Sequence, residues 1–134
     1  GLSNAVATAV KVLTSFVELD VGAIGSADPS DSVDALTAFV DRIETNNTAA
    51  GVCANSFAVS DTNADSINNT FRQVLPGNTV CFDVVAKQNT TVPPLQTPQM
   101  FKATVRVEGD GVTVLDTRDV YFLVPPEIPD IPID

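Results

Sequence analysis

The spacing of hydrophobic residues changes once near the start of the chain, from a helical period to strand alternation. Between Leu2 and Val17, apolar residues recur every three or four positions, which is the spacing of an amphipathic helix. From Val17 to Ala23 they alternate with polar residues or glycine, which is typical of a half-buried strand. We therefore predict an N-terminal helix over residues 1–17 that leads directly into a strand.

Beyond this strand the pattern indicates short strands separated by turns. Residues 32–44 fit a short helical turn that runs into a strand. Alternation is clearest over 80–87 and again over 101–108. Gly109-Asp110-Gly111 then predicts a hairpin into Val112 and Val114, and a last strand is expected over 120–124. The sequence that follows the predicted N-terminal helix is thus mainly β.

Roughly seven short strands with turns between them predict an antiparallel immunoglobulin-like β-sandwich with an N-terminal α-helix. A chain of 134 residues suits one core. We expect residues 18–126 to form the sandwich module. Residues 1–17 then belong to the end of a preceding domain or to a joining helix. The proline-rich residues 127–134 are expected to be a tail or linker, because proline cannot enter a central strand.

Composition and charge narrow the classes of partner. Hydrophobic residues make up 44% and charged residues 18%, which is a globular composition. There are 7 basic and 17 acidic residues, so the net charge is -10. Such a surface repels phosphates of nucleic acids and anionic lipids, and no apolar run has the length of a bilayer span. We expect neither a nucleic acid partner nor membrane insertion.

Catalysis has few candidate residues. The chain has no His and no Trp, which removes the commonest general base and a common platform for sugars. Carboxylate pairs such as Asp116 with Asp119, or Asp61 with Asp65, keep a hydrolase as a distant alternative. We expect the chain not to be an enzyme and to require no cofactor.

Two cysteines, Cys53 and Cys81, predict a disulfide. They lie far apart, without a C-x-x-C motif or histidine, so zinc and thioredoxin-type sites do not fit. A bridge of this span would stabilise the fold by roughly 3–4 kcal/mol and requires an oxidising compartment. Cys81 alternates with Phe82, so the bridge should lie on the outer side of a sheet. We expect an extracellular or cell-surface location, with the periplasm as the alternative.

Three N-x-T triplets make Asn46, Asn68 and Asn89 candidate glycosylation acceptors. They agree with a secreted protein, although an Asn- and Thr-rich surface also produces such triplets by chance.

Two loops resemble metal-binding motifs. The run Asp28-Pro29-Ser30-Asp31-Ser32 resembles the metal-ion-dependent adhesion site of von Willebrand factor A domains. The antiparallel pattern elsewhere lacks the parallel strands that complete such a site, so a capped turn is the stronger interpretation.

The second loop, residues 61–69, places oxygen ligands at alternate positions, in the order used by calcium loops. Ser66 stands where such loops have glycine, and Arg72 stands where an EF-hand has its bidentate glutamate. We expect a polar loop, with a weak Ca²⁺ site as the alternative. Its ligands would be Asp61, Asn63, Asp65, the Ile67 carbonyl and Asn69.

Finally, the strand and turn residues between Phe71 and Phe82, and between Phe101 and Pro126, resemble the region that follows the A domain in secreted bacterial von Willebrand factor A-containing proteins. The resemblance implies a non-catalytic, adhesion-type module of a secreted or surface protein. Its partner would be an unknown protein or surface ligand. From its apolar stripe, we expect the N-terminal helix to pack on this domain's own sheet or, failing that, against a neighbouring domain or a second copy.

Overall fold

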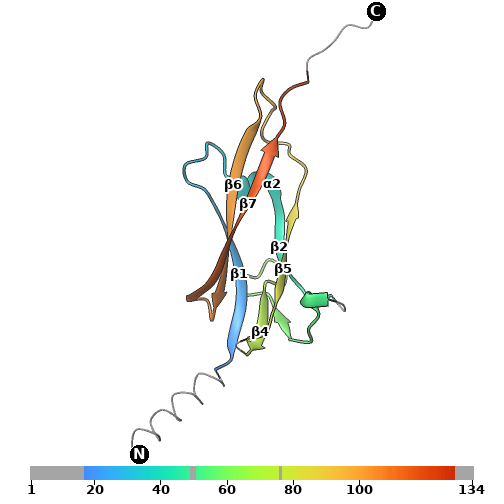
Figure 1. The fold of residues 1–134 in the computed structure, drawn as a ribbon, viewed down its shortest axis with the longest axis vertical. Coiled ribbons are helices and arrows are strands. Elements are labelled where there is room, and N and C mark those ends of the chain that lie inside the picture. The colour runs from blue at the N-terminus through green and yellow to red at the C-terminus, as the bar shows by residue number, and fades with distance from the viewer. Residues whose placement is uncertain (1–16, 49–50, 76, 129–134) are drawn as a thin grey trace, which may run out of the picture.

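The computed structural model describes residues 17–48, 51–75 and 77–128, and strands dominate them (Figure 1). Every strand pair among these residues is antiparallel. The strands are β1 (Leu19–Ala27), β2 (Val40–Asn46), β3 (Val59–Ser60), β4 (Thr70–Val74), β5 (Cys81–Ala86), β6 (Gln99–Gly109) and β7 (Thr113–Val124). The prediction of a mainly β, antiparallel chain is confirmed. The helix predicted over residues 1–17 falls outside the described residues except for Val17, which is not helical.

The strands form two sheets of unequal size. The larger sheet has the order β3-β4-β1-β6-β7, and β2 pairs with β5 in a two-stranded sheet. The chain enters the larger sheet through β1 at one end of the long axis and leaves it through β7 at the opposite end (Figure 1). The described body is therefore elongated, with its entry and exit at opposite ends.

A short helix, α2 (Ala35–Phe39), leads into β2, as the sequence predicted for residues 32–44. The Asp34 carboxylate caps it by accepting a hydrogen bond of 3.1 Å from the Thr37 backbone N–H. The β-branched Val40 then adopts extended backbone, and the helix ends there.

Buried side chains form two apolar clusters, one between α2 and the larger sheet and one between the two sheets. In the first, Phe39 contacts Phe101 of β6 and Phe122 of β7, with ring centroids 5.4 and 5.2 Å apart. In the second, Phe71 of β4 meets Phe82 of β5 edge to face at 5.4 Å. Phe71 is 0% exposed, which makes it the largest fully buried side chain among the described residues. The Phe71–Phe82 contact packs the two-stranded sheet against the larger sheet, and the Phe39 contacts pack α2 against β6 and β7.

The predicted disulfide is present. Cys53 lies in a short 3-10 turn, η1 (Gly51–Cys53), and is bonded to Cys81 at the start of β5. Because the neighbouring Phe82 faces the core, Cys81 lies on the outer side of its sheet, as the alternation predicted. The bridge therefore anchors the η1 segment to the outside of the β2–β5 pair.

The hairpin β6–β7 is longer than the sequence indicated. The residues between Val114 and Val120 were predicted to separate two strands, but they continue a single strand from Thr113 to Val124, with a bulge at Leu115. The strand tolerates Asp116 and Arg118 on the core-facing side because the two-stranded sheet does not cover that part of the larger sheet. Both side chains remain exposed.

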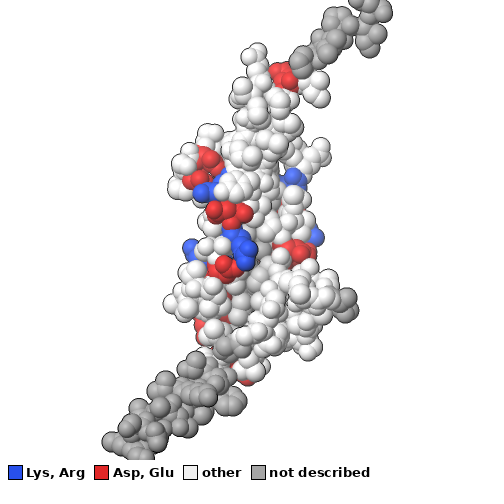
Figure 2. Space-filling model, viewed as in Figure 1, with Lys and Arg blue, Asp and Glu red and all other residues white. Residues whose placement is uncertain are grey.

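Charged side chains of both signs lie next to one another on the visible face (Figure 2). Each of five basic residues forms an ion pair with a neighbouring carboxylate: Arg42, Arg72, Lys102, Arg106 and Arg118. These cations are therefore locally neutralised and form no basic patch in the described part of the chain.

Candidate functional site

The loop from Asp61 to Asn69, called here the acidic loop, connects β3 to β4 and carries the residues predicted as calcium ligands. Asp61 organises it: Oδ2 accepts a hydrogen bond of 2.7 Å from the Ser66 N–H, and Oδ1 accepts from the N–H groups of Asn63 and Asp65. Partial burial acts to raise the pKa of Asp61, but these hydrogen bonds outweigh it and hold the pKa below its ordinary value. Asp61 is thus an anion that shapes the loop.

Two residues of the acidic loop adopt left-handed backbone. Ala64 has φ 59° and Ser66 has φ 70°, a region that favours glycine. Calcium loops have glycine at the position of Ser66, and its absence was expected to count against a calcium site. The structure makes the turn nevertheless, since the carboxylate of Asp61 holds the backbone N–H groups in place.

Asp61, Asn63 and Asp65 converge. The side-chain amide of Asn63 lies 2.7 Å from Asp61 Oδ1 and 2.9 Å from Asp65 Oδ1. With its nitrogen turned inward, this amide donates to both carboxylates and links them without a metal ion. With its oxygen inward, the same three side chains would present only acceptors, which is the arrangement that Ca²⁺ prefers.

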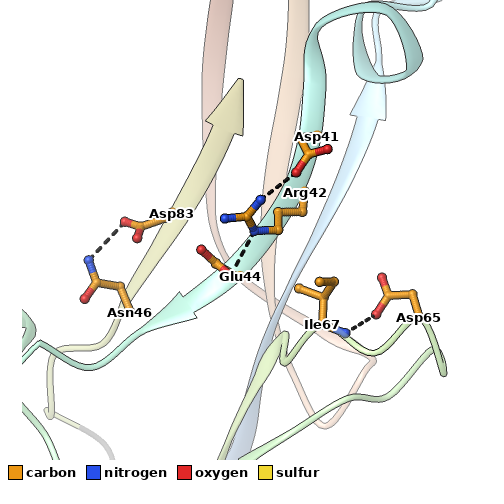
Figure 3. A network of polar contacts seen from close by, with 7 residues as sticks. All are labelled: Asp41, Arg42, Glu44, Asn46, Asp65, Ile67 and Asp83. Atoms are coloured by element: carbon orange, nitrogen blue, oxygen red, sulfur yellow. Dashed lines mark hydrogen bonds and ion pairs between the residues drawn. The ribbon is translucent and has the colours of Figure 1, made fainter. Parts of the chain in front are cut away.

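The side chain of Asn69 and the backbone N–H of Ile67 make hydrogen bonds within the loop region. The Oδ1 atom of Asn69 accepts hydrogen bonds from the hydroxyls of Thr62 and Thr70, at 2.9 and 2.7 Å, so this oxygen is already engaged. The Ile67 backbone N–H donates to Asp65 Oδ1 at 2.9 Å (Figure 3). The structure therefore brings the side chains of Asp61, Asn63 and Asp65 together, and the Asn69 side-chain nitrogen lies 3.2 Å from the Asn63 amide.

The position of an EF-hand glutamate is filled by Arg72, as the sequence showed. Its guanidinium lies on β4 and pairs with Asp20 at 3.2 Å, so it makes an ion pair with a strand and not with the acidic loop. Within residues 17–48, 51–75 and 77–128, no three His, Cys, Asp or Glu side chains gather at one point.

Two clefts flank the acidic loop and share Asn63 and Asn69. The larger, of about 440 Å³, is lined by carboxylates of Asp20, Glu108 and Asp110 together with Arg72. The smaller, of about 270 Å³, lies between β1 and β2 and includes Asp65. The loop thus contributes residues to both clefts.

Sequence reasoning missed one charged group beside the smaller cleft. Arg42 on β2 donates to Asp41 and to Glu44, and the Glu44 contact is 3.0 Å (Figure 3). The hydrogen bond to Glu44, followed by that to Asp41, raises the pKa of Arg42. Scattered single charges gave no signal, because these residues face the acidic loop only after β2 and β1 come together.

The Asp28–Ser32 segment forms the capped turn that the sequence favoured. Asp28 Oδ1 accepts from the Ser30 N–H at 2.9 Å and from the Ser30 hydroxyl at 2.7 Å. These two bonds, and then the charge of Lys102, lower the pKa of Asp28 despite some desolvation. Asp31 accepts from the Lys102 backbone N–H at 2.8 Å, so the turn is tied to β6.

The candidate glycosylation acceptors differ in their surroundings. The amide nitrogen of Asn46 donates to Asp83 at 3.0 Å (Figure 3), and that of Asn89 donates to the Val92 carbonyl at 2.7 Å. Asn68 is exposed on the acidic loop. Glycosylation of Asn68 would therefore not break a side-chain hydrogen bond like those made by Asn46 and Asn89.

The carboxylate pair Asp116 and Asp119 is not brought together. The two residues lie three positions apart on β7, so their side chains leave opposite faces of the sheet. Asp116 binds Arg118 at 3.0 Å, whereas Asp119 accepts from the Thr104 hydroxyl at 2.9 Å. The hydrogen bond to Arg118 is the main cause that lowers the pKa of Asp116.

Comparison with known proteins gives no match to a family model, a curated protein or a solved structure. Among the described residues, no helix is long and apolar enough to cross a membrane.

Proposed function

We propose that this chain is a non-catalytic structural or interaction module of the adhesion type, from a secreted or cell-surface bacterial protein. The observation that carries the proposal is the placement of entry and exit at opposite ends of an elongated body (Figure 1). A module of this shape adds length between the segments that precede and follow it. It also presents its sides to a protein or surface ligand.

The disulfide supports an extracellular site of action. Structural disulfides persist in oxidising compartments, and the bridge joins Cys53 to Cys81 on the outside of a sheet. The acidic surface, with its cations paired to carboxylates, is a poor match for nucleic acids. We further propose the immunoglobulin-like class for the fold, supported by two antiparallel sheets packed face to face, although the strands divide five and two.

The resemblance to the region that follows a von Willebrand factor A domain remains a proposal of the same kind. It rests on strand and turn residues, of which Phe71 and Phe82 now meet across the core. It accounts for a module without catalytic residues beside a domain that would supply adhesion.

Labelling of intact cells tests the location. A membrane-impermeant amine reagent should modify this chain in the source organism, or the chain should be recovered from the medium. Thiol trapping before lysis should find both cysteines oxidised. A chain that is protected from the reagent until lysis and carries two free thiols would contradict the proposal.

A second candidate function, calcium-dependent adhesion or ligand binding, is favoured by one observation. Asp61, Asn63 and Asp65 already converge within hydrogen-bond distance in the acidic loop. An ion would need only the rotation of the Asn63 amide to meet three side-chain oxygens. With no bidentate glutamate, affinity should be weak, with a dissociation constant on the order of 10⁻⁴ to 10⁻³ M.

Isothermal titration with Ca²⁺ tests this candidate through Asn63→Asp. The substitution supplies a third carboxylate and removes the amide that links the other two. If the loop binds calcium, the variant binds more tightly while its metal-free form melts at a lower temperature. If the loop is only a polar turn, the variant loses stability and Ca²⁺ does not restore it. Asp116→Asn, on a distant strand, is the matched control.

A further inference from the structure

Strand β7 is an edge of the larger sheet, and none of the described residues pairs with its outer side. Its inner side is bonded to β6 throughout, and the Glu127 N–H to Leu95 carbonyl hydrogen bond of 2.6 Å continues that pairing past the strand end. The strand has 12 residues, whereas edge strands are usually short or protected. A long row of backbone donors and acceptors is thus left open.

The side chains at the C-terminal end of this edge, from Val120 to Val124, are also apolar. Tyr121 and Leu123 are 60% and 57% exposed, and Met100 lies opposite Leu123 on β6 and is 57% exposed. The run from Val120 to Val124 contains no charge, glycine or proline. An uncharged β-branched and aromatic segment on an open edge is a template for pairing with another strand.

We propose that β7 pairs antiparallel with β7 of a second copy of this chain, about a two-fold axis through Val120. The two larger sheets then join into one continuous sheet. The inference comes from the edge alone and does not depend on the proposed extracellular role.

Geometry limits the register. In an antiparallel ladder, opposite residues share the same hydrogen-bonding type, so a two-fold axis must pass through a residue and not between two. The bulge at Leu115 interrupts β7, and the regular stretch runs from Asp116 to Val124. Val120 is the midpoint of that stretch. An axis there is the one that uses every regular position on both copies.

Charge supports the same register. An axis at Asp116, Arg118 or Asp119 would place like charges directly opposite each other, which is unfavourable. An axis at Thr117 would pair Asp116 with Arg118, but Asp119 would then face the bulged Leu115 and regular pairing would stop.

With the axis at Val120, no charge meets its like. Tyr121 lies opposite Asp119 of the second copy, and Phe122 lies opposite its Arg118. A guanidinium beside an aromatic ring is a favourable pair. The net charge of -10 on each chain opposes association at long range, so added salt should tighten the dimer.

Sedimentation equilibrium of the 134-residue chain, with two charge variants, tests the pairing. Tyr121→Asp places a carboxylate opposite Asp119 of the second copy at two symmetric positions, and should raise the dissociation constant about tenfold. Tyr121→Lys places an ammonium there and should lower it. Both changes are at an exposed position, so the fold is kept.

Cross-linking tests the register. Val120→Cys should form an intermolecular disulfide, since opposite Cβ atoms on an antiparallel pair are about 4.5–5.5 Å apart. Thr117→Cys is the matched control and should not cross-link, because Thr117 would face Leu123. A chain that stays monomeric at millimolar concentration would overturn the proposal. A dimer whose dissociation constant is unchanged by both Tyr121→Asp and Tyr121→Lys would also overturn it. So would a dimer that cross-links through Thr117→Cys and not through Val120→Cys.

Discussion

Loss of the disulfide between Cys53 and Cys81 should cost stability through the unfolded chain and hardly at all through packing. The bridge joins residues 28 positions apart. Closing a loop of that length removes unfolded-state entropy worth about 3.6 kcal/mol at room temperature. Both cysteines are partly exposed and lie outside the core, so little apolar contact is lost with the sulfur atoms.

If the loss of stability is entropic, every form of the chain without the bridge should lose the same free energy of unfolding. Cys53→Ser, Cys81→Ser, the double variant and the reduced wild-type chain all have the same open loop. Their free energies of unfolding should therefore fall by the same amount, about 3–4 kcal/mol. A bridge that acted through local packing would instead give different losses at the two positions, because Cys81 is on β5 and Cys53 is in a 3-10 turn.

Urea denaturation, followed by circular dichroism, measures these losses. The denaturant slope should rise when the loop is opened, since the unfolded chain then exposes more surface. Losses that differ by more than about 1 kcal/mol among the four open forms would refute the entropic reasoning. A wild-type chain that shows two reactive thiols in denaturant without reductant would refute the disulfide itself.

Three further predictions concern single positions. Phe71→Ala should lower the free energy of unfolding by about 3–5 kcal/mol, whereas Leu123→Ala at the exposed edge should change it by less than about 0.5 kcal/mol, both measured by urea denaturation. In thermal melts, Ser66→Gly should stabilise the fold by about 0.5–1 kcal/mol, because glycine adopts the φ of 70° at this position without strain. Gly111→Ala should destabilise the fold by a similar amount, because its φ is 71° and the space around it is open. Stability changes of the same sign in the two variants would contradict the strain argument. Because the pKa of Asp28 is lowered in the folded state, its contribution to stability is complete above about pH 4 and is lost as the pH falls through the folded pKa. The melting temperature of Asp28→Asn should therefore drop less between about pH 6 and pH 3 than that of the wild type.

The alternation of apolar residues predicted much of the fold because it reports directly on burial. Phe82 faces the core and Cys81 the outside, as period two requires. The transition from α2 to β2 was also visible, since Asp34 caps the helix and Val40 begins the strand. Both features depend on neighbours within a few residues, which is the range that sequence patterns describe.

The extent of β7 was not predictable in the same way. Asp116, Arg118 and Asp119 interrupt the apolar pattern, so the sequence indicated a break. The strand continues because it lies at an edge, where the side chains of Asp116 and Arg118 meet solvent and the backbone needs only β6. The topology of the whole sheet decides whether a strand is central or at an edge, so the local hydrophobic pattern does not predict it.

The acidic loop shows how a different chemistry can produce the same turn. Ser66 stands where calcium loops have glycine, the residue that adopts left-handed backbone without strain. The structure keeps the left-handed turn by placing the Asp61 carboxylate under the N–H groups of Asp65 and Ser66. The turn is therefore prepared before any ion arrives.

The orientation of the Asn63 amide decides whether the centre of the acidic loop contains a hydrogen-bond donor or only acceptors. With nitrogen inward, Asn63 neutralises the repulsion between Asp61 and Asp65 by donating to both, and the loop is complete. With oxygen inward, it adds to that repulsion, and only a cation can offset it. The two states exclude each other at the same atoms, so under the second candidate function Ca²⁺ would have to displace the amide nitrogen. We would then expect weak affinity, both from that competition and because Arg72 stands in place of a glutamate.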